Sequence, residues 1–396
     1  MQYDAIIIGG GACGLMCASQ AGLLGKNVLL IEGNSRLGAK ILISGGGRCN
    51  FTNLYTSESN FVGEDPSFVS HALARWQVED TVDFFEAGGI YGQEKTLGQL
   101  FPKKAKAKDV VGVFEELLKK TGQNYLLNTK ATDISKQGDL YTVLVESDGR
   151  ESSFTAPKVV LATGGLPIAK LGASDFSLRM ARSFGHSIVP TAPALVPLTI
   201  TGNRSEWYTM LSGISHYCMV SNKRIAFREN ILFTHWGLSG PAILQISTYW
   251  RPGEEIVLDL LPDSNFNELI AMERENGGRQ TVAQLLKPFF SKKLLQALNE
   301  LLPLEIKVAS LGKKQAKEIG DALHKFTVLP AGDKGYQKAE VMRGGVSTSE
   351  INNKTLESKF SKGLYLGGEC VDITGWLGGY NFQWAWAAGY VIAQEI

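Results

Sequence analysis

Two hydrophobic patterns alternate along the chain, and together they predict an α/β protein. Short continuous apolar runs, such as Asp4–Ile8 and Val28–Ile31, are typical of strands buried in a parallel sheet. The stretch between them, Leu15–Leu24, has the apolar spacing of a helix. The first 35 residues therefore predict a strand–helix–strand unit.

These patterns continue to about residue 190. Residues 66–87 and 106–121 have helical spacing, and Lys158–Ala162 is another apolar strand. The Asp-Gly pair at 148–149 is typical of a hairpin turn. Further strands are predicted at Tyr125–Leu127, Lys130–Ser135, Tyr141–Ser147 and Ser152–Ala156.

The pattern then changes and later returns. Residues 195–262 alternate in short strand-like segments, and 264–326 are helical and rich in Leu, Lys and Glu. An apolar strand running into glycines reappears at Gly363–Glu369, and Phe382–Ala393 predicts a final helix. The sheet pattern at both ends of the chain predicts one discontinuous domain with an insertion.

A glycine-rich turn follows the first predicted strand. Gly9, Gly11 and Gly14 fit the spacing G-x-G-x-x-G, and Glu32 ends the second strand, 18 residues after the last of these glycines. Gly9 permits the tight turn, Gly11 lets a pyrophosphate approach, and Gly14 lets the helix pack on the strand. The helix N-terminus offers N–H groups to phosphates, and Glu32 is placed to bind a ribose. The arrangement predicts a dinucleotide site.

Three later segments favour FAD over a nicotinamide dinucleotide. Val159–Gly165 ends in a small-residue turn, and Leu364–Glu369 places an acid just after a late strand. Gly378–Gln383 opens the last helix, whose N-terminus suits negative charge on a reduced flavin. No second G-x-G-x-x-G occurs, so NAD(P)H as electron donor is expected to reach the flavin only transiently.

The predicted fold class is α/β, with a discontinuous Rossmann-type FAD-binding domain, an inserted β-rich domain and a small helical subdomain. The predicted parts are the first part of the FAD-binding domain (1–190), the β-rich substrate domain (191–263), the helical subdomain (264–330) and the last part of the FAD-binding domain (331–396).

Bulk composition narrows the classes of partner. The 396 residues carry a net charge of +1, so no global field attracts nucleic acid or an anionic membrane. The local cluster Lys103, Lys104, Lys106 and Lys108 is either an RNA contact or a solvated helix start. No apolar run approaches the ~18 residues of a membrane span. The five cysteines indicate no disulfide framework, we predict no metal site, and we expect a cytoplasmic protein of undetermined oligomeric state.

Four longer segments resemble the YhiN/BaiN-like flavoproteins: Lys40–Asn53, Ala162–Gly165, Arg228–Pro241 and Asp372–Trp386. The resemblance covers essentially the whole chain and implies the same discontinuous FAD domain. Family members are linked to ribosomal RNA dihydrouridine synthesis, aminoacetone oxidation and bile-acid-type reduction. This chain most resembles the first branch, which implies flavin-dependent reduction of a uridine in large-subunit (23S) ribosomal RNA.

The resemblance also implies which residues hold FAD. Two positions depart from the family pattern: Ala39, where Arg is usual, and Lys338, where Thr or Gln is usual. The first affects the expected cofactor contacts and the second the substrate contacts. The implied FAD-binding residues are Gly9, Gly11, Ala12, Gly14, Glu32, Lys40, Gly47, Arg48, Ala131, Thr163, Gly164, Glu369, Asp372 and Asn381.

Reduction of the uracil C5–C6 bond needs a hydride at C6 and a proton at C5. Cys49, in the glycine-rich motif, is either the proton donor or a packed thiol beside the flavin. His235 is a second candidate, with a structural hydrogen bond as the alternative. Trp384 and Trp386 are expected to pack in the core, whereas Trp376 and Tyr380 are candidates for stacking on the flavin or a base.

Two enzymatic functions remain open at this point. One is the RNA-modifying flavin reductase. The other is a small-molecule flavin oxidase or reductase on the same fold, which the near-neutral net charge favours. Salt-dependent affinity for RNA distinguishes them.

Overall fold

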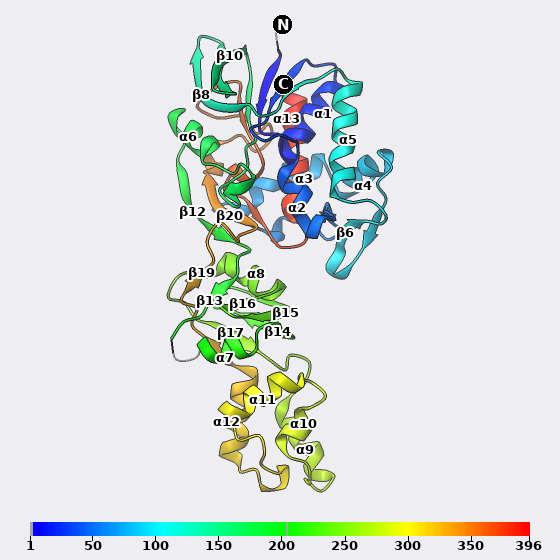
Figure 1. Ribbon diagram of the computed structural model, residues 1–396, viewed down its shortest axis with the longest axis vertical. Helices are drawn as coiled ribbons and strands as arrows, with labels where there is room; N and C mark the ends of the chain where they lie inside the picture. The colour runs from blue at the N-terminus through cyan, green and yellow to red at the C-terminus, as the bar shows by residue number, and fades with distance from the viewer. Residues whose placement is uncertain (1–2, 203–204) are drawn as a thin grey trace. The chain divides into compact units, whose positions relative to one another are not determined.

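The computed structural model describes residues 3–202 and 205–396 (Figure 1). The chain divides into two compact units. The first combines the N-terminal segment up to Ala192 with Val341–Ile396, and the second is Pro193–Glu340. The first unit is therefore discontinuous in sequence. The separate boundaries of a β-rich and a helical insertion remain a prediction.

A parallel sheet forms the centre of the first unit. Its strands, in spatial order, are β21 (Leu364–Leu366), β11 (Val159–Leu161), β1 (Ala5–Ile8), β2 (Val28–Ile31) and β7 (Asn124–Leu126). All neighbours pair in parallel. Every residue of the first four is buried, which explains why these segments are continuous apolar runs. The sheet confirms the predicted α/β class.

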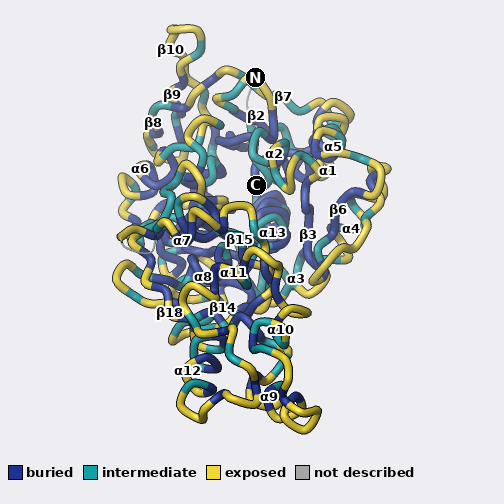
Figure 2. Tube along the Cα trace, turned by 60° about the horizontal axis from the view of Figure 1, so that its bottom comes forward, coloured by how far each residue is buried: buried dark blue, intermediate teal, exposed yellow. Residues whose placement is uncertain are grey.

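The helices of the first unit are α1 (Ala12–Leu23), α2 (Ala39–Gly47), α3 (Ser70–Arg75), α4 (Val78–Ala87), α5 (Ala107–Lys120), α6 (Phe176–Ser183) and α13 (Tyr380–Glu395). Helices α1 and α13 lie side by side (Figure 1). A Cβ at Gly389 would come within 2.4 Å of the carbonyl oxygen of Cys13, so glycine permits this close approach. Trp384 and Trp386 are buried in α13, as expected, and Figure 2 shows how little of this helix is exposed.

Smaller antiparallel sheets surround the parallel one. Asp148 and Gly149 both have positive φ, as a two-residue hairpin turn between β9 and β10 requires. These sheets are β8 (Lys130–Gln137) with β9 (Leu140–Ser147) and β10 (Arg150–Ala156), β3 (Thr52–Asn53) with β6 (Gln99–Pro102) and β5 (Gly92–Glu94), β4 (Phe61–Val62) with β22 (Thr374–Gly375), and β12 (Ile188–Ala194) with β20 (Val341–Val346).

The single helix predicted over residues 66–87 is wrong in one respect. The helix is interrupted between α3 and α4, where Trp76 and Gln77 have non-helical backbone angles. The backbone N–H of Gln77 donates to the Asp80 carboxylate at 2.7 Å, which caps a new helix. The Trp76 indole N–H donates to Thr81 at 2.8 Å. Local capping therefore overrides an apolar spacing that continues through the break.

The second unit contains an antiparallel sheet and a set of helices. The sheet has the order β18 (Phe326–Val328), β17 (Ile256–Asp259), β14 (Ser215–Ser221), β15 (Ala226–Thr234), β16 (Gly237–Ser239), β13 (Leu198–Thr199) and β19 (Gly332–Asp333). The helices are α7 (Ser205–Met210), α8 (Pro241–Tyr249), α9 (Phe266–Glu275), α10 (Val282–Leu286), α11 (Lys292–Leu301) and α12 (Lys313–His324). Helix α8 begins at Pro241, because proline is tolerated at a first helical position.

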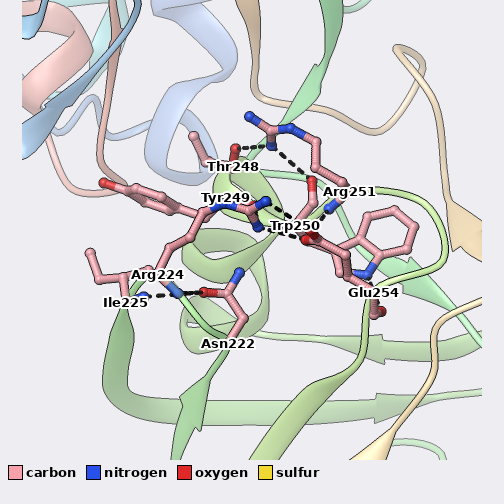
Figure 3. A network of polar contacts seen from close by, with 8 residues as sticks. All are labelled: Asn222, Arg224, Ile225, Thr248, Tyr249, Trp250, Arg251 and Glu254. Atoms are coloured by element: carbon pink, nitrogen blue, oxygen red, sulfur yellow. Dashed lines mark hydrogen bonds and ion pairs between the residues drawn. The ribbon is translucent and has the colours of Figure 1, made fainter.

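A charged network fixes the turn between β14 and β15 to the end of α8 (Figure 3). The Arg224 guanidinium donates to both carboxylate oxygens of Glu254, at 2.6 and 2.7 Å. The Arg251 backbone N–H donates to the same carboxylate at 3.1 Å. The hydrogen bonds from Arg224 lower the pKa of Glu254. The network therefore organises the loop connections of the second unit.

Candidate dinucleotide site

The backbone leading from β1 into α1 is packed too tightly for side chains at Gly9 and Gly14. Gly9 has φ +109°, and a Cβ there would lie 2.4 Å from the carbonyl oxygen of Ala162. A Cβ at Gly14 would lie 1.9 Å from the Gly9 carbonyl oxygen. A Cβ at Gly11 would meet nothing within 4 Å. Gly9 and Gly14 thus serve the fold, whereas Gly11 leaves open space at the helix N-terminus.

That N-terminus is suited to an anion. Gly11 caps α1 without any side-chain hydrogen bond, and the Leu15 N–H donates to the Gly11 carbonyl at the start of the helix. The N–H groups of the first turn, beginning with Ala12, have no intrahelical acceptors. Together with the helix dipole they fit a pyrophosphate.

Glu32 is held rigidly beside this turn. Its Oε2 accepts a hydrogen bond from the Gly10 N–H at 2.7 Å. Its Oε1 accepts from both the backbone and the side-chain amide of Asn34, each at 2.7 Å. A carboxylate can accept about four hydrogen bonds, so acceptor capacity remains for a ribose hydroxyl.

The neighbouring strand β8 is tied to the same point. The Thr129 N–H donates to the Glu32 carbonyl at 3.0 Å, which brings the start of β8 next to the end of β2. Ala131, two residues further on, is buried, and the β8–β9 register shifts between Ala131 and Asp133. Ala131, which is expected to lie beside the adenine, is therefore only two residues from Thr129, which contacts Glu32 directly.

A long-range ion pair joins two more of the expected residues. The Lys40 ammonium lies 2.6 Å from the Glu369 carboxylate, although 329 residues separate them. The other Glu369 oxygen accepts the Met342 N–H at 3.0 Å. A Cβ at Gly165 would lie 2.9 Å from that oxygen, so the turn after β11 passes directly beside this carboxylate. The structure thus brings α2, β11 and the segment after β21 together.

Thr163 and Gly164 form that turn. The Thr163 hydroxyl shares a 2.6 Å hydrogen bond with Ser177 of α6. Gly164 has φ +75°, and the nearest atom to a Cβ there would be a Glu369 oxygen at 3.9 Å. Gly164 therefore faces the same carboxylate with space between them.

The side chains of Asp372 and Asn381 both form hydrogen bonds with backbone groups. The Asp372 carboxylate accepts the Glu64 N–H at 2.9 Å, and burial raises the pKa of this carboxyl. The Asn381 side chain accepts from the Gly375 N–H and donates to the Gly375 carbonyl, both at 2.8 Å. These bonds make Asn381 a residue that positions the loop before α13.

The segment after the regular part of α2 is an unusual glycine loop. Gly45, Gly46, Gly47 and Cys49 all have positive φ. Side chains at Gly46 would meet nothing, so the loop presents open backbone. Arg48 is exposed, and its guanidinium lies 5.2 Å from the centre of the Phe101 ring.

Cys49 is completely buried beneath this loop. Burial raises the pKa of its thiol to about 12, and a hydrogen bond with Ser44 opposes this only in part. Arg48 precedes Cys49 in the sequence, but the thiol does not become a thiolate, because the loss of solvation on burial is the largest influence on its pKa. The thiol is therefore protonated at neutral pH.

His235 lies in the second unit, in the turn between β15 and β16. Its ring is exposed and contacts Trp236 edge to face at 4.1 Å, and its carbonyl accepts a hydrogen bond from Thr209 at 3.3 Å. All of the expected FAD-binding residues thus belong to the first unit, whereas His235 belongs to the second.

Sequence reasoning missed three groups that support the site. Asn34 lies two residues after Glu32 and donates to its carboxylate. A polar residue just after the strand is the sequence signal that could have indicated this contact. The Thr129 and Met342 backbone N–H groups bond to Glu32 and Glu369, and no sequence spacing indicates these contacts.

Within the described residues, no helix is long and apolar enough to cross a membrane. The same residues contain no group of three or more His, Cys, Asp or Glu side chains arranged to hold a metal ion.

Residues 3–395 match the HI0933-like protein Rossmann domain, so the chain belongs to this family. It is 39% identical to the ribosomal RNA dihydrouridine synthase of Escherichia coli (strain K12), over 100% of this chain and 98% of the relative. It is 30% identical to the 3-dehydro-bile acid delta(4,6)-reductase of Clostridium scindens, over 97% of each. The chain is an FAD-dependent oxidoreductase, and the resemblance to YhiN/BaiN-like flavoproteins is confirmed.

A solved structure agrees with this fold. The 3-ketosteroid-delta4-(5alpha)-dehydrogenase from Rhodococcus jostii RHA1 matches 99% of this chain and 97% of its own, with a TM-score of 0.52 and 14% identity. At this identity the likeness shows the architecture, which is a multidomain α/β fold.

Proposed function

We propose that the protein reduces a uridine of large-subunit (23S) ribosomal RNA to dihydrouridine, with FAD as resident cofactor and NAD(P)H as electron donor. The observation that carries this proposal is the 39% identity to a ribosomal RNA dihydrouridine synthase along the full length of both chains. The proposed substrate would place the enzyme in the cytoplasm.

The residues of the first unit fit FAD. The open Gly11 position and the free N–H groups of α1 would hold the pyrophosphate. Glu32 would bind the adenosine ribose, and Ala131 would lie at the adenine. Lys40 and Glu369 would bind nearer the flavin end, with Asp372 and Asn381 shaping the loops there. Gly47, Arg48, Thr163 and Gly164 complete the proposed set.

Reduced FAD, when bound, supplies the hydride that uracil needs at C6. The protein must then provide a proton for C5, so that one NAD(P)H and one proton yield NAD(P)⁺ and dihydrouridine. The Cys49 thiol would be the donor, since its raised pKa keeps it protonated. His235 is the second candidate. NAD(P)H would bind transiently, because the sequence has no second G-x-G-x-x-G.

Purified protein tests the cofactor and the reaction together. We expect yellow protein with non-covalent FAD, whose absorbance bleaches with dithionite and returns in air. Anaerobic incubation with NAD(P)H and unmodified 23S RNA should give dihydrouridine. Colourless protein that takes up no added FAD would contradict the cofactor assignment, whereas FAD-loaded protein without product would contradict the RNA reaction alone.

A small-molecule flavin oxidase or reductase is the second candidate. The 30% identity to a bile-acid reductase along the whole chain favours it, as does the net charge of +1. Binding to RNA that weakens steeply with salt would support the first function over the second.

A further inference from the structure

One face of the β3–β6–β5 sheet carries an unusual pair of cations. In an antiparallel sheet, Phe101 of β6 lies opposite Gln93 of β5. The Lys95 ammonium lies 4.5 Å from the Phe101 ring centre and the Arg48 guanidinium 5.2 Å from it. Two cations on one ring are held in place by cation–π attraction despite their mutual repulsion.

These cations are not neutralised by nearby carboxylates. Among the described residues, the ion pairs found involve neither Arg48 nor Lys95, and both side chains are exposed. Residues 91–108 contain five lysines and one glutamate, in a chain whose net charge is only +1. The positive charge is therefore local to this hairpin and its flanks.

Exposed aromatic rings lie at both ends of the hairpin. Tyr91 is 61% exposed, and its carbonyl accepts the N–H of Lys103, which Lys104 follows. Tyr55 is 65% exposed and lies against Gly98 near the other end, where Lys95 is found. Tyr91 and Lys95 are four positions apart along an extended strand, which is about 14 Å. Each end thus offers an aromatic face next to at least one lysine.

The same sheet is tied to the loops proposed to face the flavin. A Cβ at Gly45 would lie 2.8 Å from the Phe101 ring, so the glycine loop rests on that ring. The Asn53 side chain donates to the Gly378 carbonyl just before α13, at 2.9 Å. The charged face is therefore joined directly to the loops proposed to hold the cofactor.

We infer that this face, formed by Arg48, Lys95, Lys103, Lys104, Tyr55 and Tyr91, binds single-stranded RNA and leads the substrate uridine to the flavin. Unpaired cations fit phosphates, and exposed tyrosines fit unstacked bases, which is the combination that single-stranded RNA requires. The inference rests on the proposed RNA substrate and adds where that RNA binds. Lys106 and Lys108 belong instead to the start of α5.

Matched variants test the charged part. Lys103→Gln with Lys104→Gln should weaken binding of a single-stranded oligouridine several-fold. The slope of log affinity against log salt, which is negative, should become less steep by about 1.4, because each lost phosphate contact accounts for about 0.7. The control is Lys119→Gln with Lys120→Gln, exposed lysines about 20 Å away at the other end of α5. Equal salt slopes for the two double variants would overturn the inference.

The aromatic part has a different signature. Tyr55→Ala with Tyr91→Ala should weaken oligouridine binding roughly tenfold or more while leaving the salt slope unchanged, because stacking releases no counterions. Tyr125→Ala, an exposed tyrosine on β7, is the control. FAD content should equal that of wild type in every variant, which shows that each one folds.

The outcomes separate this inference from the proposed reaction. Wild-type protein that binds RNA through this face but forms no dihydrouridine would contradict the reaction and leave the surface standing. Product formation with unaltered binding in all variants would overturn the surface alone. Wild-type protein that forms dihydrouridine in 23S RNA but does not bind oligouridine would likewise overturn the surface alone.

Discussion

Glu32 is the side chain on which the proposed dinucleotide site depends most directly. It joins three segments, since its carboxylate accepts hydrogen bonds from Gly10 and Asn34 and its carbonyl accepts one from Thr129. The same carboxylate is proposed to bind the ribose. Under this proposal the two carboxylate oxygens serve both the conformation of the turn and the ligand.

Replacing Glu32 with Ala should weaken FAD binding by roughly 1.5–3 kcal/mol, the value of a charge-assisted hydrogen bond. Glu32→Gln should lose less, because an amide oxygen can still accept from Gly10. Titration of apoprotein with FAD, followed by flavin fluorescence, measures both. Equal affinities of wild type and Glu32→Ala would remove Glu32 from the site.

The role of Cys49 depends on two effects of burial. Burial raises the pKa of the thiol, which keeps it protonated, and it also shields the thiol from solvent. If it gives the proton to C5, Cys49→Ala should keep FAD and RNA binding but lose roughly 10²–10⁴ in the rate of dihydrouridine formation. Single-turnover kinetics measure this rate. A serine hydroxyl is a weaker acid than a thiol, so normal turnover by Cys49→Ser would show that the Cys49 thiol only packs in the interior. His235 would then be the next residue to replace.

At the scale of elements, the turn between β1 and α1 separates what the fold needs from what the ligand needs. Gly14 has no room for a side chain, whereas Gly11 has room that a pyrophosphate would occupy. The two glycines share one motif but differ in what surrounds them.

Paired substitutions exploit this difference. Gly14→Ala should destabilise the protein by about 1–3 kcal/mol or more, because the new methyl group overlaps the Gly9 carbonyl. Gly11→Ala should melt close to the wild-type temperature yet retain little FAD. Thermal melts of the apoproteins and flavin content after purification test the pair. A strongly destabilised Gly11→Ala apoprotein would contradict the assignment.

The elements also show how far sequence reasoning reaches. Continuous apolar runs predicted the parallel sheet, because a strand that is buried on both faces needs apolar residues at nearly every position. The helix α2 was hidden in a glycine-rich stretch, and the break at Trp76 depends on a cap that apolar spacing does not register. The pairing of Lys40 with Glu369 depends on the folding of distant segments and has no local signal.

At the scale of the whole molecule, buried thiols couple stability to alkaline pH. Every cysteine is buried, and burial raises the pKa of Cys49, Cys218 and Cys370 to about 12 and that of Cys13 and Cys17 further. In the unfolded chain the pKa of a thiol is about 8.5. The folded state therefore binds more protons above that pH, and folding stability falls as pH rises toward 12.

Each thiol should contribute a loss of about 1.4 kcal/mol per pH unit in this window. Urea unfolding of wild type and Cys17→Ala, compared at pH 8 and 10, measures one thiol. The variant should lose less stability between the two pH values, whatever its stability at pH 8. An identical loss in both proteins would contradict the role assigned to this buried thiol.

The most direct test of the central claim is the mass of ribosomal RNA in living cells. Escherichia coli lacking its own ribosomal RNA dihydrouridine synthase would express this protein or its Gly11→Ala variant. Nuclease digestion and mass spectrometry of 23S RNA should show the mass of two added hydrogen atoms on one uridine with the wild-type protein, and far less with the variant. Unmodified 23S RNA in cells that contain abundant FAD-loaded wild-type protein would contradict the account.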